Sequence, residues 1–103
     1  MDYEVVWSPA ALEDVESLAE YIARDSEFYA RTIVDKILDM ARKLKDFPSA
    51  GRIVPELEDE MIRERFVYSY RLIYRLHNKE ITILAVIHGK RLLDSLDDRI
   101  QCS

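Results

Sequence analysis

The spacing of apolar side chains changes twice along the chain. Apolar residues alternate with others over residues 3–7, recur every three or four positions between residues 12 and 44, and alternate again from residue 61 to 77, before a nearly unbroken apolar run at 81–87. Alternation is typical of a strand with one buried face, and a repeat of three or four is typical of an amphipathic helix. The pattern therefore predicts one strand, a helical region and a second group of strands.

Local signals divide the helical region into two helices. Ser8 and Pro9 form a good N-cap and first helical residue, so the first helix is expected to begin there. Asp25 and Ser26 offer a break and a second cap, and a longer helix follows. Two helices joined by so short a link are expected to form an antiparallel hairpin, which the segment 47–51 ends.

The strand region is expected to contain three strands. Residues 61–68 and 70–77 alternate, and Asn78 and Lys79 suit a tight turn before the segment 81–87, which is apolar on both faces and therefore suits a central strand. Residues 52–60 are interpreted as irregular chain, and the apolar residues after Gly89 as a short helix or a packing tail. The fold class is α+β: an N-terminal strand, an antiparallel two-helix hairpin, and a three-stranded antiparallel meander, with the helices on one face of the sheet.

Composition narrows the class of protein. A chain of 103 residues with 49% hydrophobic and 34% charged residues fits one soluble domain, here residues 1–103. No apolar run approaches the ~20 residues that span a bilayer, and the acidic start differs from a signal peptide, so a cytoplasmic location is expected. The one cysteine, Cys102, allows no internal disulfide.

Charge is distributed unevenly. The net charge is −5 and falls on residues 1–51, whereas residues 61–93 carry a local excess of five positive charges. An acidic protein is a poor non-specific nucleic-acid binder, because phosphate neutralisation dominates that affinity. A basic face is nevertheless available, and its arginines suit phosphate or carboxylate. Six residues are expected to share one concave sheet face: Arg63, Arg65, Arg71, Arg75, His88 and Arg91.

Each of these residues also has a purely structural interpretation. The arginines can serve as solubilising surface charges, some of them paired with Glu64 or with the acids at 56–60. His88 can act as a general acid or base, or it can simply be the residue that ends the last strand. Tyr68, Tyr70 and Tyr74 suit stacking on bases, but core positions are favoured. Neither histidine has a second ligand at metal-binding spacing, and no nucleophile or nucleotide motif occurs, so no metal or cofactor is expected.

Several segments together resemble the RelE/ParE toxins of bacterial and archaeal toxin–antitoxin systems. They are residues 6–11 (VWSPAA), 48–57 (PSAGRIVPEL), 62–64 (IRE), 70–75 (YRLIYR) and 83–91 (ILAVIHGKR). The resemblance implies the fold described above and a cognate antitoxin that neutralises the toxin, with DNA contacted only through the antitoxin. It also implies roles in plasmid stabilisation and stress response.

The resemblance leaves three functions open. ParE-like members poison DNA gyrase, RelE-like members cut messenger RNA on the ribosome, and a relative that only binds its antitoxin is the third alternative. Segment 52–57 and the segment 88–91 resemble ParE-like members more than RelE-like ones, which favours the gyrase-directed function. Arg71 and Arg91 match the arginines that RelE-like nucleases use, but the usual lysines correspond to Ile62 and Glu64, and the C-terminal tyrosine has no counterpart.

Two sets of site residues follow from this resemblance. For a ribonuclease, the candidates are Arg71 and Arg91, with His88, Arg63, Arg65 and Glu64 as weaker ones. Basic strands and an apolar tail also suit an acidic amphipathic segment, so the expected antitoxin-binding residues are Arg63, Arg65, Arg71, Arg75, Leu92, Leu93 and Leu96.

Overall fold

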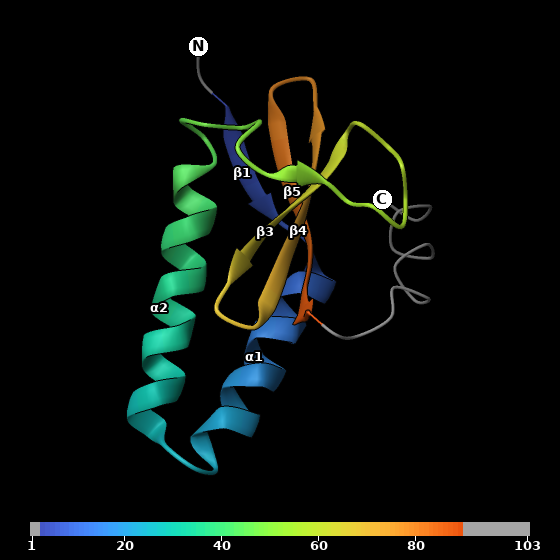
Figure 1. Cartoon of the computed structure of the whole chain (residues 1–103). Coiled ribbons are helices and arrows are strands. Elements are labelled where there is room, and N and C mark those ends of the chain that lie inside the picture. Colours follow the sequence, from blue (N-terminus) through green and yellow to red (C-terminus); the bar gives the residue numbers. More distant parts are fainter. Residues whose placement is uncertain (1–2, 90–103) are drawn as a thin grey trace.

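The computed structural model describes residues 3–89, which form two helices and one five-stranded sheet (Figure 1). The elements follow in the order β1 (Glu4–Trp7), α1 (Pro9–Ala23), α2 (Glu27–Lys43), β2 (Arg52–Ile53), β3 (Ile62–Val67), β4 (Tyr70–His77) and β5 (Glu80–His88). This arrangement confirms the α+β prediction of a strand, a helical hairpin and an antiparallel meander.

Both helices begin where the sequence predicts. The Ser8 hydroxyl accepts a hydrogen bond from the backbone N–H of Ala11 at 3.1 Å, with Pro9 in the first turn. The Ser26 hydroxyl accepts from Tyr29 N–H at 3.0 Å. Each contact satisfies one of the amide groups that a helix N-terminus leaves without an intrahelical acceptor.

The strands lie in the order β1-β5-β4-β3-β2. The strand β1 runs parallel to β5, and the other neighbours are antiparallel. Asn78 and Lys79 both have left-handed backbone angles, with φ of 48° and 62°, as a two-residue hairpin turn requires, which confirms the predicted turn. A bulge between Ile73 and Tyr74 interrupts the β4–β5 register.

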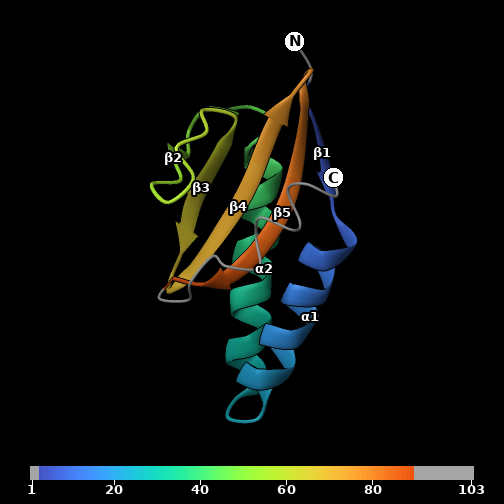
Figure 2. The same cartoon turned by 90° about the vertical axis from the view of Figure 1, so that its right-hand side faces the viewer.

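Both helices pack on one face of the sheet, with α2 behind β4 and β5 in Figure 2. The main core lies there and includes Leu72, Tyr74 and Ile83 from the sheet. A second cluster on the opposite face includes Ile62, Ile73, Leu84, Ala85, Ile87 and Val54, with Leu57 against it. The strand β5 is therefore buried on both faces, as its unbroken apolar run predicts.

One element differs from the prediction. Residues 52–60 were expected to be irregular, but Arg52 and Ile53 form β2 and pair with Glu64 and Arg63. Two residues are too short to show any period, so this pairing leaves no sequence signal. The predicted tail elements after Gly89 lie outside the described residues. No helix within residues 3–89 is long and apolar enough to cross a membrane.

Candidate functional site

The arginines of β3 and β4 lie on opposite faces of the sheet. Arg63 and Arg65 stand opposite Tyr74 and Leu72, on the helix face, whereas Arg71 stands opposite Phe66 on the other face. The turn at 68–69 sets Val67 opposite Tyr70, so odd-numbered β3 residues share a face with even-numbered β4 residues. The expectation that all these arginines share one concave face is therefore wrong.

Arg71 lies at the centre of a buried network of charges. Arg71 is only 4% exposed, and its Nε donates to Glu64 Oε1 at 2.6 Å. Its Nη1 and Nη2 donate to the two carboxylate oxygens of Glu56, both at 3.0 Å. Glu64 is 1% exposed and also accepts from Arg52 Nε at 2.6 Å. This is the alternative in which the arginine pairs with Glu64 and with an acid of the neighbouring loop.

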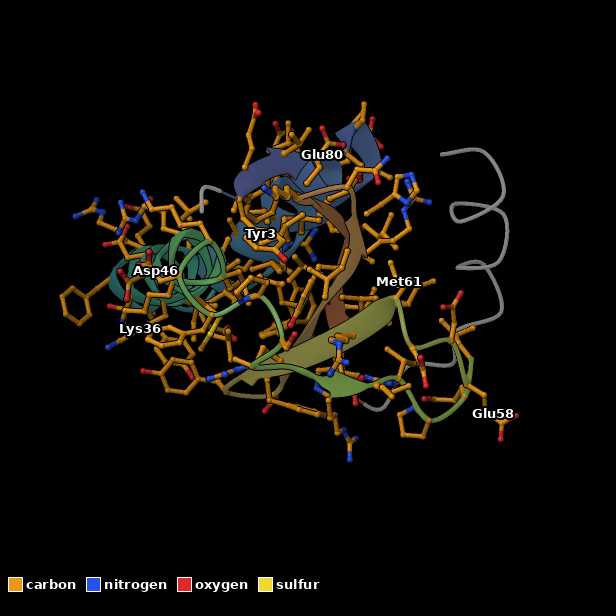
Figure 3. All side chains as sticks on the ribbon, turned by 90° about the horizontal axis from the view of Figure 1, so that it is seen from above. Tyr3, Lys36, Asp46, Glu58, Met61 and Glu80 are labelled. Carbon is orange, nitrogen blue, oxygen red and sulfur yellow. The ribbon has the colours of Figure 1, made fainter. Side chains whose placement is uncertain are left out.

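The network favours the charged form of its central arginine. Hydrogen bonding to Glu56, and then to Glu64, raises the pKa of Arg71 even though burial opposes this. The hydrogen bond from Arg71 in turn lowers the pKa of the Glu56 carboxyl. Glu56 belongs to the loop that carries Glu58, which projects on the side of the molecule away from Asp46, a residue of the turn that follows α2 (Figure 3). The charge-assisted hydrogen bonds of the network therefore link this loop to the sheet.

Arg63 and Arg65 belong to a separate site beside the end of α2. Arg63 Nη1 donates to the Gly51 carbonyl at 2.9 Å, while its buried Nε has no acceptor among the described residues. Arg65 is half-buried and borders a cavity of about 190 Å³. We call this cavity the Arg65 groove; its lining residues are Met40, Lys43, Leu44, Phe47, Ala50 and Arg65.

Tyr74 connects the two sites. Its hydroxyl donates to the Pro48 carbonyl at 2.8 Å and accepts from Gly51 N–H at 2.9 Å. Burial raises the pKa of this phenol. A Cβ at Gly51 would lie 2.6 Å from Tyr74 Oη, so only glycine fits. The segment that enters β2 is thus held between the groove and the charged network.

The other candidate residues lie apart from both sites. His88 contacts Tyr70 edge-on, with ring centroids 5.8 Å apart, and burial raises the pKa of Tyr70. Tyr68 is exposed, whereas Tyr74 belongs to the core. Arg75 stands opposite Ile62, on the Arg71 face. The remaining candidates, Arg91, Leu92, Leu93 and Leu96, lie outside the described residues.

Sequence reasoning missed how the acids are arranged. Glu64 lies on the same face as Arg71, two residue pairs further along the ladder, and its even number on β3 is the only signal of this. Arg52 precedes the acidic loop in the sequence, but its Nε donates to Glu64 of β3. Within residues 3–89, no three His, Cys, Asp or Glu side chains gather as a metal site would require.

Residues 5–93 match the family described as the ParE toxin of the type II toxin–antitoxin system parDE. The chain belongs to this ParE toxin family. Among solved structures, it is similar to the chromosomal ParDE toxin–antitoxin system of P. aeruginosa, with 20% identity, 85% of this chain and 97% of that chain covered, and a TM-score of 0.71. This confirms the predicted family and its fold.

Two further structures resemble this ParE family member in fold. The toxin–antitoxin complex RelBE2 of Mycobacterium tuberculosis gives 20% identity and a TM-score of 0.61, with 85% of this chain and 99% of that chain covered. The YoeB dimer of Staphylococcus aureus gives 18% identity and 0.58, with 84% and 95% covered. No curated protein matches the sequence.

Proposed function

We propose that this protein is the toxin of a type II toxin–antitoxin pair, that a cognate antitoxin neutralises it, and that its target is DNA gyrase rather than messenger RNA. Membership of the ParE family supports the first part. The observation that carries the choice of target is the state of Arg71, whose Nε, Nη1 and Nη2 all donate to carboxylates of the same chain.

Cleavage of RNA by its 2′-hydroxyl needs a base, an acid and cations that stabilise the developing charge. Arg71 matches the arginine that a RelE-like nuclease would use, but here Glu56 and Glu64 already neutralise it. A phosphate would have to displace Glu56 and then lie close to Glu64, against like-charge repulsion. Inhibition of gyrase by protein contact needs no exposed catalytic cation.

The overall charge supports the same choice. A protein with a net charge of −5 is repelled by the dense phosphate surface that a ribosome-dependent nuclease must approach. Binding to another protein makes no such electrostatic demand. A toxin that meets gyrase works in the cytoplasm, where we place this protein.

The structures of similar fold support an antitoxin partner. One is a chromosomal ParDE toxin–antitoxin system, and another, RelBE2, is a toxin–antitoxin complex. We propose that a short open reading frame beside this gene encodes the antitoxin, and that it binds this chain directly.

Two assays run side by side test the target. Purified protein is added to gyrase supercoiling of plasmid DNA and to a translation reaction whose messenger is mapped by primer extension. Inhibited supercoiling or trapped cleaved plasmid, with intact messenger, is expected, and premixed antitoxin should reverse it. Codon-positioned cuts that disappear in a folded Arg71→Lys variant would refute the proposal. No effect in either assay would indicate a protein that only binds its antitoxin.

A further inference from the structure

We propose that a cavity between α1 and the paired ends of β4 and β5 binds an arginine side chain of gyrase. This inference rests on the proposed target and names the chemistry of one contact with it. The cavity has a volume of about 550 Å³, and we call it the Asp14 cavity. It shares no lining residue with the Arg65 groove. The residues that carry the argument are Asp14, Tyr21, Tyr70, Val86 and His88.

Three aromatic rings line the Asp14 cavity. Tyr21 is 67% exposed, and the rings of Tyr70 and His88 lie edge-on to each other. Burial, and then the nearby Tyr29 and Tyr21, raise the pKa of Tyr70, so its phenol remains uncharged close to two other phenols. A cation over the face of such a ring is attracted to it within about 6 Å. A guanidinium gains further because it is flat and stacks on the ring.

Tyr21 already makes a contact of this kind within the chain. The guanidinium carbon of Arg24 lies 5.9 Å from the centre of the Tyr21 ring. Arg24 is not among the residues that line the cavity, and an aromatic ring has two faces. Tyr21 therefore has a second face with which to take a cation from a partner.

Oxygen acceptors for a guanidinium lie beside these rings, at the edge of β5. The strand β1 pairs with this edge only as far as Ile83. Beyond it, Asp14 Oδ2 accepts from Val86 N–H at 3.0 Å, and the Ser8 hydroxyl donates to the Leu84 carbonyl at 3.4 Å. By the two-residue period the Val86 carbonyl points to the same side. A guanidinium has five N–H donors, which carboxylate and carbonyl oxygens together can accept.

The charge of α1 selects a cation over a phosphate. Between Pro9 and Ala23 this helix carries four acidic residues and no basic one. They are Glu13, Asp14, Glu16 and Glu20. Such a surface attracts a cationic side chain and repels a nucleic acid. The rings, the acceptors and the charge therefore agree on an arginine presented by a protein.

Titration of the whole protein with N-acetyl-arginine amide, followed by amide NMR, tests the cavity itself. The Val86 and His88 signals are expected to shift saturably, with a Kd on the order of 1–10 mM for a single side chain. N-acetyl-citrulline amide has nearly the same shape without the charge and should cause no saturable shift. Asp14→Asn keeps an oxygen for Val86 N–H and should weaken arginine binding by about five-fold or more. Equal shifts from both compounds, or none from arginine, would refute the cavity.

Binding of purified gyrase, measured by biolayer interferometry, tests the partner. Asp14→Asn and Tyr21→Leu are expected to weaken binding by about five-fold or more. Two matched variants should stay within about two-fold of the wild type: Glu16→Gln removes the same charge from an exposed part of α1, and Tyr21→Phe keeps the ring. Circular dichroism and melting temperature verify that each variant folds.

The outcomes separate the two proposals. If gyrase binds the wild type and all four variants within about two-fold, the Asp14 cavity is refuted as a contact and gyrase stands as the target. If gyrase does not bind the wild type although the arginine compound does, the proposed target is refuted. If Tyr21→Phe weakens binding as much as Tyr21→Leu, recognition of a cation by the ring is refuted.

Discussion

Replacing Glu64 by Gln tests whether the buried network holds the sheet and its loop together. The substitution keeps the size of the side chain but removes a charge that is 1% exposed and binds both Arg71 and Arg52. Removing one partner of a buried ion pair typically costs 3–5 kcal/mol, because the remaining charge stays buried. Glu56 still neutralises Arg71, so about 3 kcal/mol is expected.

That loss is large for a domain of this size. A chain of 103 residues is expected to have an unfolding free energy of roughly 5–15 kcal/mol. A loss of about 3 kcal/mol should lower the melting temperature by roughly 12–24 °C. Urea unfolding, followed by circular dichroism at pH 7, measures the free energy directly, and the slope against urea should stay unchanged if only stability differs.

Two companion variants make the measurement decisive. Arg52 binds the same carboxylate, but its side chain is 62% exposed, so Arg52→Gln should cost less than about 1 kcal/mol. The double substitution of Glu64→Leu with Arg71→Met replaces the pair by apolar groups and should stay within about 1.5 kcal/mol of the wild type. If Glu64→Gln costs no more than Arg52→Gln, the buried network does not stabilise the fold as argued.

Three further predictions concern neighbouring groups. Gly51→Ala places a Cβ 2.6 Å from Tyr74 Oη, so a loss of about 1–3 kcal/mol is expected in thermal melting, and an unchanged melting temperature would contradict the packing described. Tyr74→Phe leaves the Gly51 amide and the Pro48 carbonyl without their partner and should cost about 1–3 kcal/mol. Because burial raises the pKa of Tyr74 above 10.0, its loss should also remove a late step from the ultraviolet titration of the tyrosines. Arg71 lowers the pKa of Glu56 below its usual 4.5, so its stabilisation is complete above that pH and disappears as the pH falls through the lowered pKa. The difference in unfolding free energy between the wild type and Glu56→Gln, measured by urea unfolding, should therefore be present at pH 7 and shrink in acid. An equal difference at pH 7 and in acid would refute the ion pair between Glu56 and Arg71.

Local features of the fold could be predicted because their causes are local. A cap residue such as Ser8 or Ser26 bonds an amide three residues away, and Asn78 and Lys79 supply their own turn geometry. These signals need no knowledge of the rest of the chain. The element order followed from them, together with the apolar periodicity, whereas the family was predicted from the resemblance of several sequence segments.

The candidate site depended on pairings between distant residues. On β4 the consecutive residues Leu72, Ile73 and Tyr74 are all buried, so alternation alone does not say which face the helices cover. The face of Arg71 relative to Arg65 depends on the length of the turn between their strands. The parallel pairing of β1 with β5 has no local signal either, because the two strands are at opposite ends of the described chain.

The pairing of β1 with β5 also sets when the fold can form during synthesis. Ser8 Oγ donates to the Leu84 carbonyl at 3.4 Å across a sequence separation of 76 residues. At about 5–20 residues per second, a ribosome needs roughly 4–15 s to make that separation, far longer than chain collapse takes. The interior strand β5 is thus the last of the strands within residues 3–89 to be made. The synthesis of β5 therefore sets the earliest time at which β1 can pair within the sheet, and an antitoxin made over the same seconds can be present before this pairing is complete.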